Sequence, residues 1–115
     1  MELINLLSEM DALVVKGQIP TAIDKFFADD ATTSDFSGVT TNSKAAMLEK
    51  MSGFLGGIQT VNGITLHQAL AGKTITMSEY TFDFDMKDGS HILWHEIIHR
   101  TWKNGKVIKE QYFTN

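Results

Sequence analysis

The sequence predicts an α+β fold in which three helices pack against a curved, mainly antiparallel sheet. Apolar residues recur at helical spacing in the first half of the chain, and from Ile58 onward they alternate with polar residues. Two dipeptides typical of tight hairpin turns, Asp88-Gly89 and Asn104-Gly105, divide the second half. Helices followed by hairpin-connected strands form a two-layered, cone-shaped α+β domain. No repeat or linker interrupts this pattern, so we expect one domain over residues 1–115.

Three helices are expected before Ile58. The first ends at Lys16-Gly17, and its apolar stripe consists of Leu3, Leu6, Leu7, Met10, Leu13 and Val14. The second starts near Pro20, which a first helical turn tolerates, and Asp29-Asp30 breaks it. Asn42 or Ser43 caps the third helix, which ends at the glycines Gly53, Gly56 and Gly57. Strands are expected over residues 31–35, 64–70, 74–86, 91–102 and 106–113.

Composition and charge exclude several classes of function. The formal net charge is −4, which argues against a phosphate-binding surface and hence against nucleic-acid binding. The chain has no cysteine, so no disulfide framework or cysteine zinc site is expected. The glycines near Gly56 lack the Lys-Ser or Lys-Thr of a phosphate loop, and no cofactor is expected. The start of the chain lacks a signal peptide and the longest early apolar run, Ala12 to Val15, cannot span a membrane, which predicts a cytoplasmic protein without membrane contact.

The two turn signals predict which side chains share a face of the sheet. If Asn104-Gly105 is a two-residue turn, His99 lies opposite Glu110 and Ile97 opposite Tyr112. If Asp88-Gly89 is another, the same face extends onto the preceding strand. The predicted inner wall then contains Tyr80, Phe82, Phe84, His95, Ile97, His99, Glu110 and Tyr112. Such a polar minority in an apolar cup is typical of a small-molecule site.

The opposite, outer face of the sheet is predicted to carry Trp94, Ile98 and Trp102. No further helix of the chain is available to cover these large apolar side chains. They therefore predict a homodimer that forms through this face; isolated surface aromatics are the alternative interpretation.

His95-Glu96-Ile97-Ile98-His99 matches the H-E-x-x-H pattern of zinc proteases. That motif needs a helix, on which positions four apart project together. Here the segment is expected to be a strand, where the two histidines lie about 13 Å apart. We therefore expect no metal site.

The run Phe26-Phe27-Ala28-Asp29-Asp30-Ala31-Thr32-Thr33-Ser34-Asp35-Phe36-Ser37-Gly38 resembles a family signature. It is similar to the ADDAT-x-x-D-x-x-G element of ketosteroid isomerases and SnoaL-like polyketide cyclases, within the nuclear transport factor 2-like superfamily. The resemblance spans nearly the whole chain and implies three N-terminal helices on a mixed sheet, a cystatin-like roll whose concave face and helices enclose a ligand cavity. It also implies dimerisation through the outer face.

The resemblance places Asp35 where ketosteroid isomerases carry their general base. A carboxylate at the mouth of an apolar cup can take a proton from a carbon acid and return it elsewhere. The oxyanion donors of that family are absent, because Met10 and Ile97 occupy the corresponding positions. A strict ketosteroid isomerase is therefore not expected. A strand-end carboxylate or loop cap is an equal alternative for Asp35.

A second candidate site pairs His99 with Glu110 across the last hairpin, as an acid–base pair of the type found in SnoaL-like cyclases. A structural ion pair is the alternative. His67, if Ala71-Gly72 is a turn, joins the inner wall, although a structural role is again an alternative. Met47, Met51 and Phe54 are expected to roof the cavity, where flexible thioethers suit apolar ligands; helix-to-sheet packing explains them equally well.

Together these features predict a domain that binds a small apolar, carbonyl-bearing or cyclic molecule. Residues expected to contact it are Met10, Met47, Met51, Phe54, His67, Tyr80, Phe82, His95, Ile97 and Tyr112. Asp35, His99 and Glu110 are the candidate catalytic groups for a proton transfer or cyclisation. A non-catalytic binding or protein-interaction module of the same fold is the competing hypothesis.

Overall fold

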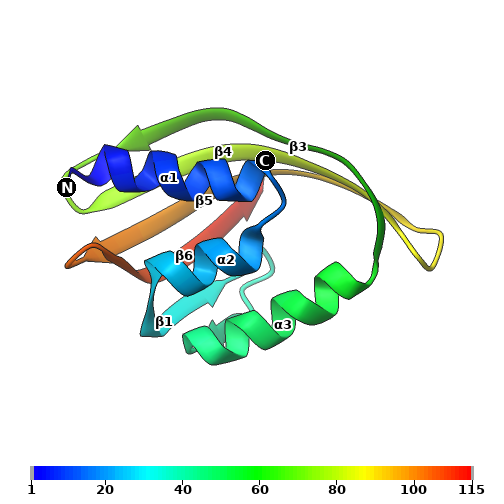
Figure 1. Ribbon diagram of the computed structural model, residues 1–115, viewed down its shortest axis with the longest axis horizontal. Coiled ribbons are helices and arrows are strands. Elements are labelled where there is room, and N and C mark those ends of the chain that lie inside the picture. The colour runs from blue at the N-terminus through cyan, green and yellow to red at the C-terminus, as the bar shows by residue number, and fades with distance from the viewer. Residues whose placement is uncertain (1, 115) are drawn as a thin grey trace.

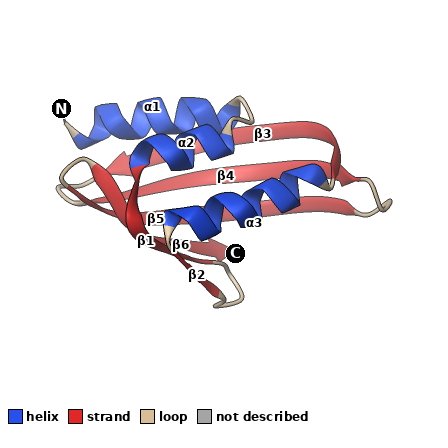
Figure 2. Ribbon diagram, turned by 60° about the horizontal axis from the view of Figure 1, so that its bottom comes forward, coloured by secondary structure: helices blue, strands red, loops and turns tan. Residues whose placement is uncertain are grey.

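The computed structural model describes residues 2–114 and has three helices on one face of a six-stranded sheet (Figure 1). The strands follow the order β2-β1-β6-β5-β4-β3, and β1 runs parallel to β6 while the other neighbours are antiparallel. Figure 2 shows that all three helices cover the same side of the sheet. The predicted α+β class with a mixed, mainly antiparallel sheet is confirmed.

The first and third helices end where the sequence predicts, whereas the second ends earlier than expected. Helix α1 covers Leu3–Val15 and is followed by Gly17, whose positive φ of 80° suits glycine. Helix α2 covers Ile19–Phe26, with Pro20 in its first turn. Helix α3 covers Lys44–Gly56, and Ser43 rather than Asn42 is its cap, since the Ser43 hydroxyl accepts from the Ala46 amide at 3.2 Å.

Two strands separate α2 from α3. Strand β1 covers Phe27–Ser34 and begins directly after α2, so Asp29 and Asp30 lie within the strand and not at a helix end. The short strand β2, Thr40–Asn42, was not expected from the sequence. It folds back on β1 through the turn that starts at Asp35.

The second half of the chain forms the long strands. They are β3 at Ile58–Ala71, β4 at Ile75–Met86, β5 at His91–Lys103 and β6 at Lys106–Thr114. The period-two pattern predicted these four strands, although β3 starts earlier than expected. No helix within residues 2–114 is long and apolar enough to cross a membrane.

The predicted register of the last hairpin is wrong by one residue. Lys103 pairs with Lys106 around Asn104-Gly105, as a two-residue turn requires. A β-bulge then follows, because Trp102 pairs with Val107 but Thr101 pairs with Lys109. Beyond the bulge the partners are His99 with Gln111, Ile97 with Phe113 and Arg100 with Glu110. Beyond the bulge, the β5 side chains that share a face with Glu110 are therefore the opposite set from the predicted one.

The predicted pairing of β4 with β5 is also wrong by one residue, because of the loop between them. This loop covers residues 87–90 and is longer than a two-residue turn, since Asp85 pairs with His91. The side chain of Asp88 accepts from the Ser90 amide and hydroxyl, and Gly89 has a φ of 90°. As a result Phe82 pairs with Trp94 and not with His95. A one-residue slip moves every side chain of a strand to the other face.

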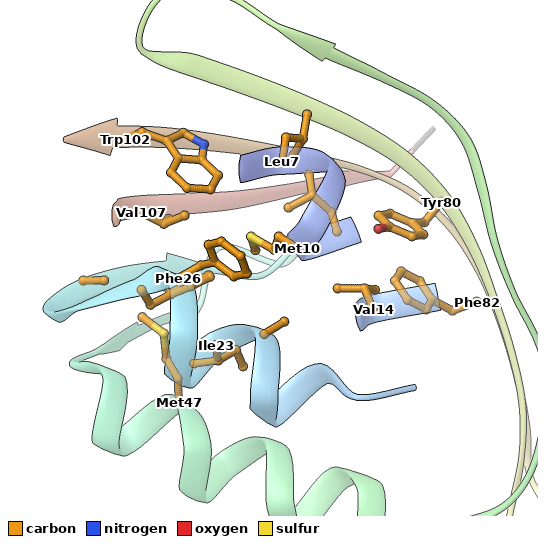
Figure 3. Packing of buried hydrophobic residues seen from close by; sticks show 14 of the residues in the cluster. Leu7, Met10, Val14, Ile23, Phe26, Met47, Tyr80, Phe82, Trp102 and Val107 are labelled. Atoms are coloured by element: carbon orange, nitrogen blue, oxygen red, sulfur yellow. The ribbon is translucent and has the colours of Figure 1, made fainter. Parts of the chain in front are cut away.

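The core lies between the helices and the inner face of the sheet (Figure 3). Leu7 and Met10 of α1 and Phe26 of α2 pack against Trp102 and Val107 of the sheet. The Trp102 ring stands edge-on to Phe26, with centroids 6.3 Å apart. Trp102 and Ile98 are thus buried, at 5% and 1% exposed, and the prediction that they lie on the outer face with Trp94 is wrong.

Candidate functional site

A cavity of about 340 Å³ opens between the helix layer and the inner face of the sheet. Apolar side chains from all three helices and from β1, β4 and β5 make most of its wall. Phe36 and Val39, about half exposed, stand in the turn between β1 and β2 and line the same cavity. The polar residues that line it are Thr33, Asp35, Lys50, Glu96, Arg100, Glu110 and Tyr112.

Most of the apolar residues predicted to contact a ligand lie at this cavity. Those that line it are Met10, Met47, Met51, Phe54, Phe82 and Tyr112. Tyr80 does not: its side chain is fully buried between the sheet and α1, where its hydroxyl donates to Asp11 Oδ1 at 2.6 Å. Burial, and then the neighbouring Asp11 carboxylate, raise the pKa of Tyr80. Tyr80 therefore belongs to the packed core next to the cavity.

The four predicted residues His67, His95, Ile97 and His99 do not line the cavity. The register places the last three on the outer face, because their neighbours on β5 face the helices. His67 also lies on this face, beside a bulge in β3, where its Nε2 is 2.7 Å from Thr81 Oγ1. The prediction that these residues form the inner wall is wrong, and so is the predicted pairing of His99 with Glu110.

The outer face carries its own polar contacts. His95 Nε2 lies 2.5 Å from Glu79 Oε2, and the rings of His67 and His95 meet edge-on at 5.5 Å. Gln68 also donates to Glu79, and these contacts, led by the Gln68 hydrogen bond, lower the pKa of Glu79. Within residues 2–114 no group of three or more His, Cys, Asp or Glu side chains is arranged to hold a metal ion.

A buried ionic network joins the cavity to α1. Arg100 Nε donates to Glu110 Oε2 at 2.8 Å, and its Nη1 lies 3.8 Å from Asp11 Oδ1. Glu110 also accepts from Thr33 Oγ1 at 2.7 Å, and Asp11 accepts from Ser78 Oγ at 2.9 Å. One buried cation thus stands between two buried carboxylates, which leaves the network with a net negative charge.

Glu96 is the carboxyl group most perturbed by this environment. It lies on the inner face of β5, is 4% exposed, and makes no hydrogen bond or ion pair in the described part of the chain. Burial first, and then the negative charges of Glu110 and Asp35, raise the pKa of Glu96 to about 7. A carboxyl with such a pKa is present in both protonation states near neutral pH and can give or take a proton.

Asp35 lies at the cavity but is engaged by its own turn. Its Oδ1 accepts from the Ser37 amide at 2.9 Å, the Ser37 hydroxyl at 2.6 Å and the Val39 amide at 3.0 Å. The Ser37 hydroxyl, followed by the backbone amides, lowers the pKa of Asp35. A carboxylate stabilised in this way is a weak base, and the contacts are those of a loop cap.

The sequence analysis missed Glu96, Arg100 and Asp11. Asp11 sits within the apolar stripe of α1, where a charged residue is a signal of a buried polar partner. Glu96 and Arg100 alternate with Trp94, Ile98 and Trp102 on one face of β5. The preference of tryptophan for burial could have indicated that this face, and not the histidine face, points inward.

Comparison with family models gives no match, and neither does comparison with the sequences of curated proteins. Solved structures are similar throughout the chain. A Mesorhizobium loti protein named as a candidate SnoaL-like polyketide cyclase superposes with a TM-score of 0.88 at 20% identity, over 98% of this chain and 99% of that one. A Catenulispora acidiphila protein with a ketosteroid isomerase-like fold, in complex with trimethylamine, gives 0.77 at 16% identity, over 96% and 85%.

A third similar structure is that of TerC co-crystallised with polyporic acid. Its TM-score is 0.75 at 11% identity, over 97% of this chain and 90% of that one. At these identities the likeness concerns the fold. The expected resemblance is thereby confirmed: this chain has the fold shared by SnoaL-like and ketosteroid isomerase-like proteins.

Proposed function

We propose that the domain binds a small, mostly apolar, carbonyl-bearing or cyclic molecule in the cavity, and that Glu96 exchanges a proton with it. The observation that carries the proposal is the Glu96 carboxyl, buried in an apolar cavity without a hydrogen-bonding partner in residues 2–114 and with a pKa of about 7. A general acid or base is most effective when its pKa lies near the working pH.

The shape and lining of the cavity support the binding part of the proposal. A cavity of about 340 Å³ with an apolar wall and a few polar groups suits a small organic ligand. Two of the similar structures are named with small molecules, trimethylamine and polyporic acid. Glu110, held by Arg100 and Thr33, contributes negative charge that keeps Glu96 a better proton acceptor than an ordinary carboxylate.

Proton transfer can be measured without knowing the natural product. A panel of apolar cyclic ketones in D₂O would be followed by NMR for loss of the α-proton signal. We expect the Glu96→Gln variant to lose roughly 10²- to 10⁴-fold in exchange rate, because the amide keeps the volume but cannot accept the proton. Quenching of Trp94, which lines the cavity, reports binding, with Trp94→Phe as the control for that signal.

The Asp35→Asn variant in the same assay separates the two roles of Asp35. If Asp35 is the general base, Asp35→Asn lowers the exchange rate at nearly constant stability. If Asp35 only caps its turn, the same substitution lowers stability at a nearly constant exchange rate. Full exchange activity in Glu96→Gln would overturn the assignment of the base. Binding across the panel without any exchange would favour a non-catalytic binding module.

We also propose a homodimer through the outer face of the sheet, with different residues from those the sequence suggested. Apolar side chains that are 40% exposed or more gather there: Leu70, Met77, Leu93, Ile97 and Phe113. Several large exposed apolar side chains on one face of a sheet favour association.

Light scattering at micromolar concentration should give the mass of a dimer for the wild-type protein. Ile97→Glu should give a monomer, because it places a charge at the centre of the apolar face. Val15→Glu, on the exposed side of α1, is the matched control and should stay dimeric. A monomeric wild-type protein would contradict this proposal.

A further inference from the structure

We propose that the cavity recognises a cation, namely the protonated or quaternary amine of an otherwise apolar molecule, held between the aromatic rings around Trp94 and the carboxylate of Glu96. The inference rests on the ligand-binding part of the proposed function and not on its proton-transfer part. Three features of the cavity support it: its aromatic rings, a carboxyl that has no partner among the described residues, and its charge balance.

The rings form a connected group at one end of the cavity. Phe54 of α3 stacks on Trp94 of β5 with centroids 5.7 Å apart, and Phe36 meets Trp94 edge-on at 5.9 Å. Phe84 stands edge-on to Phe54 at 5.9 Å and lies beside Phe82 at 6.0 Å. All five rings line the cavity. The electron-rich faces of such rings, tryptophan above all, attract a cation more than a neutral group of equal size.

The Glu96 carboxyl lies next to this group of rings. It is two residues from Trp94 on the same face of β5, which puts the two Cα atoms about 6–7 Å apart. It is 4% exposed and has no hydrogen bond or ion pair in residues 2–114. Buried charged groups are almost always paired, and a ligand cation would supply the pairing that residues 2–114 do not.

The charged groups around the cavity leave this end negative. Glu110 and Asp35 are the acids whose negative charge acts on Glu96. The Arg100 guanidinium is held between Glu110 and Asp11. Arg100 stands four residues beyond Glu96 on β5, which separates their Cα atoms by about 13 Å. Lys50, exposed on α3, donates to Thr41 and acts on Asp35, and Tyr112 is neutral because burial raises its pKa. A cation is therefore favoured over an anion near Trp94.

The test compares two probes of the same shape. Benzyltrimethylammonium carries a positive charge, and neopentylbenzene is its neutral carbon analogue; both would be titrated at pH 8 in the same dimethyl sulfoxide content. We expect the cation to bind at least about tenfold more tightly. Glu96→Gln should remove at least about tenfold of the affinity for the cation and leave that for the neutral analogue unchanged or improved. Glu49→Gln, an exposed acid on α3, should change neither.

A second variant and a pH series keep the result decisive. Trp94→Leu should lower the affinity for the cation about tenfold more than the affinity for the neutral analogue. Affinity for the cation should rise from pH 6 to pH 8 as Glu96 ionises, while affinity for the neutral analogue should not rise. Equal affinity for both probes, or cation binding unchanged in Glu96→Gln, would overturn the cation site and leave small-molecule binding intact. Binding of neither probe, nor of the ketone panel, would overturn both proposals.

Discussion

Arg100→Met is expected to lower the free energy of unfolding by about 3–5 kcal/mol. Arg100 is 2% exposed and its charge lies between the buried carboxylates of Glu110 and Asp11. Methionine fills most of the volume but leaves two buried negative charges facing each other without a cation. The cost is that of uncompensated buried charge rather than of lost packing.

Urea denaturation followed by far-UV circular dichroism measures this loss directly. Lys73→Met, in the exposed loop between β3 and β4, is the matched control and should change stability by less than about 0.5 kcal/mol. Adding Glu110→Gln to Arg100→Met should restore part of the stability, because one of the two unpaired charges is removed. A loss below about 1 kcal/mol in the single variant would contradict the buried network.

The free energy of unfolding of Glu96→Gln, relative to that of the wild-type protein, is expected to be higher at alkaline pH than at acid pH. The pKa of Glu96 is about 7 in the folded protein and 4.5 in the unfolded chain, so the folded state holds the proton more tightly. Stability of the wild-type protein therefore decreases as pH rises from about 4.5 to about 7, and the loss is constant above that range. The shift corresponds to about 3 kcal/mol, which the glutamine variant does not lose.

The measurement is the difference in unfolding free energy between Glu96→Gln and wild type at several pH values from 4 to 8.5. Titrating groups far from Glu96 contribute equally to both proteins and cancel in this difference. The cost of placing an amide in the cavity is independent of pH and appears as a constant offset. Glu49→Gln, whose acid is exposed, should show a flat difference. A flat difference for Glu96→Gln as well would show that this carboxyl is ionised normally in the folded protein.

Local signals predicted the elements of the fold. The stripe of α1, Pro20 in α2 and the cap of α3 all act within a few residues of where they stand. The alternation after Ile58 likewise predicted the long strands, and the Asn104-Gly105 turn pairs Lys103 with Lys106 as expected. These features could be recognised because helix capping, turn geometry and side-chain periodicity depend on neighbouring residues.

These local signals did not predict which face of each strand points toward the helices. The bulge beside Trp102 and the longer loop at residues 87–90 each move the register by one residue from the predicted one. Together they give β5 the opposite orientation relative to both neighbouring strands. Tyr80, Phe82, Glu110 and Tyr112 keep the face that was predicted, because β4 and β6 are not turned.

The sequence by itself therefore determined the fold class, most of the element boundaries and a cavity lined by Met47, Met51 and Phe54. Only the tertiary structure decided which side of β5 faces that cavity. A strand has a period of two, so both faces of β5 are consistent with its sequence, and the choice depends on which face buries more apolar surface against the helices. Burying Trp102 and Ile98 brought Glu96 and Arg100 inside with them and left the histidines outside.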